Sequence, residues 1–163
     1  MAQSDPPPVR PARFDSLQQQ VFLNLWRTYD RLRMFEDELL GRFNLTPQQY
    51  NVLRLLQAHR TEGLQTLQLA GRLVSRAPDI TRMVDKLEER GLVERLRRAE
   101  NRRVVEVRIT AEGSRLVQRI AGPLQECHTR QLGHMTAEDL ERLSDLLCKA
   151  RQPHEDDASH WRE

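Results

Sequence analysis

The stretch from Leu67 to Ile109 limits what this chain can fold into more than any other part of it. Its pattern predicts two short helices, followed by two strands around a charged connection. In the second of these helices Ile80, Val84 and Leu87 follow one another at i, i+4 and i+7, and Met83 lies beside them. One stripe of that helix can therefore be buried.

A second face of the same helix is polar and mostly basic. Asp79, Arg82 and Lys86 fall at i, i+3 and i+7, and Arg76 lies just ahead of them. A helix N-terminus favours anions, and cationic side chains attract phosphate. Such a helix can bury one side in a core and offer the other side to phosphates and base edges.

The composition is compatible with this interpretation. At 163 residues the chain is long enough for one domain with a core of its own. Charged residues make up 31% and aromatic residues 5%, which suits long solvated helices better than a sandwich or a barrel. The net charge is only +2, but residues 64–108 hold eleven Lys and Arg against seven Asp and Glu. Nucleic-acid binding needs such a local basic patch, although a charge run can equally be a solvated face.

Two cysteines, Cys127 and Cys148, are too few for a disulfide framework. The first residues show no basic segment followed by an apolar one, so no secretory signal is predicted. No apolar run reaches the roughly 18 residues that a membrane span needs. The expected compartment is the reducing cytoplasm.

The N-terminal part predicts an arm and then a long helix. Residues 1–14 contain four prolines and are expected to be disordered. Asp15 and Ser16 can cap a helix that begins at Leu17. Its broad apolar stripe comprises Leu17, Val21, Leu25, Leu32, Phe35 and Leu39, widened by Phe22, Trp26, Tyr29 and Leu40. A small domain cannot bury so broad a stripe, which favours a second copy of the chain as the partner.

Two shorter helices are expected before the central one. Thr46 as the cap and Pro47 at the first helical position start a helix that runs to about His59. A turn over residues 61–63 follows, and then a short helix. The residues expected to face inward on that short helix are Leu67, Ala70 and Leu73.

The central helix and the strands have their own boundary signals. Ser75 or Arg76 is expected just before the helix, Pro78 in its first turn, and Gly91 just after its end at Arg90. The strand candidates are Val93–Arg97 and Arg103–Ile109, the second of which alternates apolar and charged residues. The connection from Arg98 to Arg102 lacks glycine, so we expect a loop longer than a two-residue turn.

Two more helices should complete the domain. Thr110 is the expected cap of a helix that carries Leu116, Ile120 and Leu124, with a candidate kink at residues 122–123. Thr136 is the cap of the last helix, with Asp139 at its N3 position. The apolar side of that last helix consists of Leu140, Leu143, Leu146 and Leu147. Residues 151–163 predict a polar tail.

Helix, turn, helix, strand, loop and strand is the order of a winged helix-turn-helix, in a chain that is mainly α. A helix fits the major groove of duplex DNA, and the residues at its N-terminus reach base edges. An arginine-tipped loop beside it can enter the minor groove, where negative potential is concentrated. The tip here, residues 97–103, contains four arginines. The alternative is a solvated hairpin end with no partner.

At these residues the chain resembles the multiple-antibiotic-resistance regulator (MarR) family of bacterial transcription factors. The resemblance covers about Phe14 to Lys149. Its most specific parts are Leu69-Ala70-x-Arg72-Leu73, the run from Ile80 to Val93, and Ile109-Thr110-x-x-Gly113. It implies a homodimer that binds pseudo-palindromic operators, represses nearby genes and responds to small aromatic or anionic effectors. It also implies dimerisation helices at 15–45 and 110–150 around a winged helix-turn-helix lobe at 46–109.

The resemblance also implies which residues contact DNA. The base and backbone candidates at the central helix are Arg76, Pro78, Asp79, Thr81 and Arg82, with Lys86 one turn further on. Phosphate candidates at the preceding helix are Thr66 and Gln68, and the wing candidates are Arg98, Asn101, Arg102 and Arg103.

Two positions depart from the family pattern. The family wing commonly carries Asp-x-Arg at its tip, where this chain has Asn101 and Arg103, so the arginine is kept and the acid is not, although Glu100 is adjacent. Asp79 replaces a more usual hydroxyl residue. It either accepts from a cytosine amino group or caps its own helix.

The effector and the thiols are less constrained. Trp26, Tyr29, Arg33 and Tyr50 can line a ligand pocket of the kind the resemblance implies, or can be core and dimer packing. Cys127 and Cys148 are expected to be structural thiols rather than a redox sensor. Cys127, His128 and His134 do not have the spacing of zinc ligands, so neither a metal nor another cofactor is expected.

No enzyme is expected, because the sequence lacks a glycine-rich phosphate loop, a nucleophile elbow and a His-Glu-x-x-His motif. The sequence predicts a homodimeric regulator that binds double-stranded DNA specifically, most simply as a repressor. The alternative is a winged-helix module that binds another protein and not specific DNA.

Overall fold

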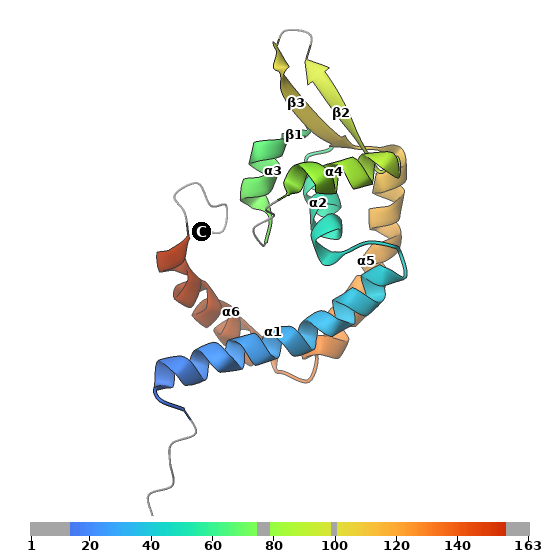
Figure 1. The fold of residues 1–163 in the computed structure, drawn as a ribbon. Coiled ribbons are helices and arrows are strands. Elements are labelled where there is room, and N and C mark those ends of the chain that lie inside the picture. The colour runs from blue at the N-terminus through green and yellow to red at the C-terminus, as the bar shows by residue number, and fades with distance from the viewer. Residues whose placement is uncertain (1–13, 75–78, 99–100, 156–163) are drawn as a thin grey trace, which may run out of the picture. The chain divides into compact units, whose positions relative to one another are not determined.

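The computed structural model describes residues 14–74, 79–98 and 101–155, without the side chains of residues 97–104. Two compact units, Met1–Met34 and Phe35–Glu163, meet within helix α1 (Leu17–Gly41). The helices that follow are α2 (Pro47–Ala58), α3 (Thr66–Arg72), α4 (Ile80–Glu89), α5 (Ala111–Leu132), α6 (Ala137–Arg151) and a 3-10 turn at Gln152–His154. The strands are β1 (Leu64–Gln65), β2 (Val93–Arg98) and β3 (Asn101–Ile109). In Figure 1 the β2–β3 hairpin projects beyond the cluster of α2, α3 and α4. The prediction of a mainly α winged helix-turn-helix is confirmed.

Hydroxyl caps start most of the helices where the sequence predicted them. Ser16 Oγ accepts a hydrogen bond from the backbone N–H of Gln19 at 3.1 Å. Three threonines accept in the same way from the N3 residue of their helix: Thr46 of α2, Thr110 of α5 and Thr136 of α6. Each bond satisfies a backbone donor that the helix itself cannot pair.

Helix α4 begins later than the sequence suggested. Its N-cap is Asp79, so the expectation of a start at Ser75 or Arg76 is wrong. Asp79 Oδ1 accepts from the backbone N–H of Arg82 at 3.0 Å, which fixes the first turn at that point. Ser75, Arg76 and Pro78 lie outside the described residues.

The sheet has a third strand that the sequence did not reveal. The strand order is β1-β3-β2, and both pairings are antiparallel. Strand β1 is only two residues long, too short for a periodic signal, and pairs Leu64 with Val107. The sheet therefore ties the turn before α3 to the root of the wing.

The wing connection is shorter than predicted. Strands β2 and β3 pair as far as Arg98 and Asn101, so only two residues separate them, and the expectation of a longer loop is wrong. The register of the β2–β3 pairing shifts between Arg97 and Arg98. Three residues of β3, 102–104, lie between the partners of Arg97 and Arg98, so the extra length of chain falls within the strand and not in the connection.

One hydrophobic core holds the second unit together. Its fully buried members include Val84 and Leu87 of α4, with Ile80 and Met83 packed against it, as the periodicity predicted. In α3 the assignment differs, because Leu69 is fully buried and Leu67 is 84% exposed. The inward placement predicted for Leu67 is therefore wrong. A seven-residue helix shows too few turns for its buried stripe to be read reliably.

Gly113 explains part of the sequence pattern after the wing. A Cβ at this position would lie 2.2 Å from the backbone oxygen of Leu92. The Thr110 N–H donates to that same oxygen at 3.1 Å, and its hydroxyl donates to Gly91 O at 2.7 Å. The start of α5 is thus pressed against the chain between α4 and β2, and only glycine fits there.

Apolar side chains remain exposed on α1 and on α6. None of the residues of α6 is buried, and its Leu146 is 56% exposed. On α1 the exposed apolar side chains include Leu17, Val21, Phe22, Leu25, Trp26 and Tyr29. Helix α5 continues through Pro123. No helix among the described residues is long and apolar enough to cross a membrane.

Candidate nucleic-acid interface

Helix α4 has three faces with different surroundings. The first packs into the core through Val84 and Leu87. The second carries Asp79, Arg82 and Lys86, all of which are exposed, as the sequence predicted. Since this second face holds two cations at the surface of the lobe, it is the natural place for a polyanion.

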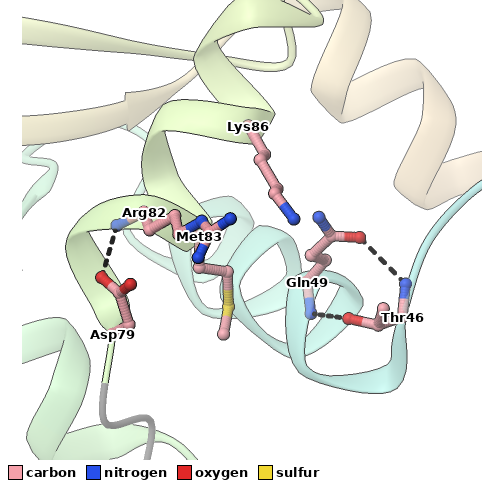
Figure 2. Close-up of a pocket in the computed structure, with 6 residues that line it drawn as sticks. All are labelled: Thr46, Gln49, Asp79, Arg82, Met83 and Lys86. Carbon is pink, nitrogen blue, oxygen red and sulfur yellow. Dashed lines mark hydrogen bonds between the residues drawn. The ribbon is translucent and has the colours of Figure 1, made fainter.

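A shallow groove of about 350 Å³ lies between this face and the start of α2 (Figure 2). It is lined by Thr46, Gln49, Asp79, Arg82, Met83 and Lys86. Gln49 Oε1 accepts from the backbone N–H of Thr46 at 3.0 Å, so the amide group of Gln49 has a fixed orientation. Figure 2 shows its nitrogen turned toward the side of the groove where Lys86 lies. Sequence reasoning treated Thr46 only as a cap and missed Gln49 as a surface donor.

Asp79 caps the N-terminus of its own helix, α4. Its carboxylate accepts from the Arg82 N–H, so the capping interpretation is confirmed. The remaining oxygen lies at the edge of the groove (Figure 2). An acid there repels phosphate, and the cap is its first function.

The N-terminus of α3 presents Thr66 and Gln68 near the surface, with Gln68 exposed. Gln68 Oε1 accepts from the backbone N–H of Gln65 at 3.0 Å, which leaves its amide nitrogen as a donor. The other end of α3 is pinned to α2, because Arg72 Nη1 lies 2.6 Å from His59 Nε2. Exposed Leu67 lies between the two polar candidates.

The wing candidates are placed by their backbone alone. Arg98 and Asn101 face each other at the last paired position of the hairpin, and Arg102 and Arg103 follow in β3. Their side chains lie outside the described residues, as do the whole of Arg76 and Pro78.

The third face of α4 binds the wing, and the sequence analysis missed it. Arg95 of β2 bonds through Nη2 to Asp85 Oδ1 at 2.5 Å and to the Thr81 carbonyl oxygen at 3.3 Å, and through Nη1 to Glu88 Oε2. The backbone N–H of Arg95 also donates to Glu88 Oε1 at 3.0 Å. Partial burial disfavours the charged guanidinium, but its bonds to the two carboxylates outweigh this and raise the pKa of Arg95. The available signal was the spacing of Thr81, Asp85 and Glu88 at i, i+4 and i+7.

The four ligand candidates have different surroundings. Tyr50 is only 9% exposed and belongs to the core cluster of the second unit. Burial, the largest effect, raises the pKa of its phenol, while Arg54 lowers it and Glu36 raises it. Trp26, Tyr29 and Arg33 are exposed on the part of α1 in the first unit. The packing interpretation is therefore the better one for Tyr50.

The two cysteines are both free thiols. Cys127 is buried in α5, and burial is the main cause that raises the pKa of its thiol, with Glu36 adding to it. Cys148 is half-buried, with Arg151 Nη2 at 3.5 Å from its sulfur. Within the described ranges no three His, Cys, Asp or Glu side chains gather closely enough to hold a metal ion.

Comparison with known proteins decides the family. The MarR family model matches residues 45–105. A crystal structure of a MarR transcription factor from Planctomyces limnophilus is 52% identical, with a TM-score of 0.66, over 83% of this chain and 98% of that one. The chain belongs to the MarR family.

Curated relatives of this MarR-family chain are regulators as well. HTH-type transcriptional regulator FarR of Neisseria gonorrhoeae is 31% identical over 68% of this chain and 75% of its own length. HTH-type transcriptional repressor MdtR of Bacillus subtilis is 25% identical over 88% and 91%. The MarR-family chain is thus a DNA-binding transcriptional regulator, as its helix-turn-helix predicted, and not the interaction module considered as the alternative.

Proposed function

We propose that this regulator binds a pseudo-palindromic operator as a homodimer and represses the adjacent gene. The observation that carries the proposal is the exposed cationic face of α4, Arg82 and Lys86, beside the groove at the start of α2. A MarR mutant from Escherichia coli, crystallised with operator DNA, shares the fold at a TM-score of 0.73 and 23% identity. Because the target is DNA, we place its action in the cytoplasm.

Each part of the lobe takes a separate role on the duplex. Helix α4 enters the major groove of the DNA, where Arg82 reaches a base edge and Thr81 lies beside the sugar–phosphate backbone. Lys86 and the Gln49 amide, on the two walls of the groove, hold a phosphate. Thr66 and Gln68 at the start of α3 hold another, with Arg76 and Pro78 in the segment between the two helices.

The wing supplies the minor-groove contact. Arg98, Asn101, Arg102 and Arg103 come at the end of the hairpin, which projects past the helices (Figure 1). An arginine in the minor groove is favoured where the groove is narrow and its potential most negative. Arg103 is the residue that matches the family's wing arginine.

The exposed apolar faces support the homodimer. Leu146 and Leu147 on α6, and the stripe of α1 that includes Phe22 and Trp26, are solvent-exposed in the single chain. On each helix taken by itself, exposed apolar side chains of this kind are typical of an interface. Two copies joined there would carry two recognition helices, which read half-sites about one DNA turn apart.

The proposal also includes a small-molecule effector. A structure of CouR from Rhodococcus jostii, bound to p-coumaroyl-CoA, is 26% identical with a TM-score of 0.71. We propose a small aromatic or anionic effector for this chain also, with Trp26, Tyr29 and Arg33 as the candidate contacts. Such a ligand acts by favouring a dimer whose recognition helices no longer match the half-site spacing.

The test is fluorescence anisotropy of a duplex from the region upstream of the gene, titrated at several salt concentrations beside a scrambled duplex. Specific binding predicts tighter association with the native duplex and a steep loss of affinity with salt. Equal affinity for both duplexes at every salt concentration would contradict the proposed operator.

A further inference from the structure

The strongest contact that the DNA-binding role leaves unexplained is the one between α4 and the wing. Arg95 is the only described residue of β2 that bonds to two carboxylates of α4, Asp85 and Glu88. Its side chain is 23% exposed, against 48% for Asp85 and 39% for Glu88, so the guanidinium is the most enclosed member of the group. None of these groups lines the groove beside the DNA-facing side of the helix.

The geometry of this group is that of a clamp. The guanidinium is planar and rigid, and here it bonds to three acceptors that span two turns of α4, namely Thr81 O, Asp85 Oδ1 and Glu88 Oε2. A fourth bond, from the Arg95 backbone N–H to Glu88 Oε1, ties the strand itself to the helix. Rotation of α4 about its axis, or tilting of the hairpin, must break several of these bonds together.

The same strand position is fixed on its other side by the sheet. Arg95 pairs with Val107 of β3, and Val107 pairs with Leu64 of β1. Both Val107 and Leu64 are buried in the core. The clamp is therefore anchored to strands that are buried in the core of the lobe and not to the tip of the hairpin.

From this we propose that Arg95 is a positioning residue that makes α4 and the wing a single DNA-reading unit. It touches no DNA itself. It sets the angle between the major-groove helix and the minor-groove arginine, so that both can reach the same duplex. The proposal rests on the proposed function, since it presupposes that Arg103 contacts the operator.

A double-mutant cycle between the clamp and the wing tests it. In the parent protein Arg103→Ala should weaken operator binding by about 5- to 150-fold. In an Arg95→Met background the same change should cost less than about 2-fold, because the wing is no longer aimed at the groove. An equal cost in both backgrounds overturns the coupling and leaves the wing contact standing. No cost in the parent overturns the wing contact and this proposal with it.

A second variant distinguishes a positioning role of Arg95 from a purely electrostatic effect of these charges on DNA binding. Asp85→Asn with Glu88→Gln keeps neutral acceptors but removes two negative charges next to the DNA-binding face. If the carboxylates acted only by repelling DNA, or if Arg95 bound phosphate, this variant should bind the operator more tightly. The clamp predicts weaker operator binding, by at least about 5-fold, while binding to a scrambled duplex becomes tighter because the two negative charges are gone. Tighter operator binding overturns the proposal.

Two controls guard against loss of fold. Arg115→Met removes the same charge from an exposed pair with Glu112 on α5 and should leave the Arg103→Ala cost unchanged. Arg95→Lys keeps the charge but cannot reproduce three directed bonds, so it should behave like Arg95→Met in the cycle. If Arg95→Lys restored the full cost of Arg103→Ala, a clamp of directed bonds would be excluded.

Discussion

Replacing Gly113 with alanine should destabilise the protein, although local helix propensity predicts the opposite. Gly113 is the N3 residue of α5, and alanine in a helix is favoured over glycine by up to about 1 kcal/mol. The added Cβ would meet Leu92 O at 2.2 Å and Ile109 Cγ1 at 2.7 Å, whereas ordinary contact begins at 3.4 Å. The backbone of Leu92 must then move by about 1.2 Å.

The backbone of Leu92 cannot move in this way without disturbing other contacts. The Leu92 oxygen is the acceptor of the Thr110 N–H, and Val93, the next residue, begins β2. Overpacking against fixed backbone costs about 3 kcal/mol, so the net loss for Gly113→Ala is about 2 kcal/mol. For a chain of this size that lowers the melting temperature by about 4–8 °C.

The assay is thermal unfolding followed by circular dichroism, at one protein concentration because dimerisation would otherwise shift the midpoint. Gly71→Ala in α3 is the matched control, since nothing lies within 4 Å of the Cβ it would add. That control should be neutral or stabilising by up to about 1 kcal/mol. A Gly113→Ala variant as stable as the Gly71→Ala variant would refute the close approach of α5 to Leu92.

Three further predictions follow from burial and charge. Leu87→Ala, at a fully buried position of α4, should cost about 2–5 kcal/mol by denaturant unfolding, and a loss below about 1 kcal/mol would contradict its core placement. Lys86→Gln should reduce the slope of log affinity against log salt by about 0.9, since one phosphate contact is lost, whereas Lys149→Gln on α6 should leave the slope unchanged. Burial raises the pKa of the Cys127 thiol in the folded protein above its value in the unfolded chain. The thiol therefore contributes to the free energy of unfolding below the pKa of the unfolded chain, and this contribution is lost as the pH rises through the pKa of the folded protein. Iodoacetamide should therefore label Cys127 far more slowly in the folded than in the unfolded protein at pH 8, and equal rates would exclude a buried thiol.

Local sequence signals were sufficient wherever the structure depends on neighbours along the chain. The caps at Thr46, Thr110 and Thr136 bond to a backbone three residues on, so residue type and spacing alone identified them. The buried stripe of α4 was equally readable, because a ten-residue helix repeats its period often enough. Family membership came from the same stretch.

Only the tertiary structure decided what depends on distant partners. Strand β1 exists because Leu64 meets Val107, and its two residues carry no period. Leu69 rather than Leu67 is buried because the core lies on that side of a helix too short to reveal it. The sequence likewise did not determine which side of α4 Arg95 contacts. Its bond to Asp85 joins residues that are ten positions apart and separated by a turn and part of a strand. Contacts of that kind follow from how elements pack, and packing is a property of the folded chain rather than of any local segment.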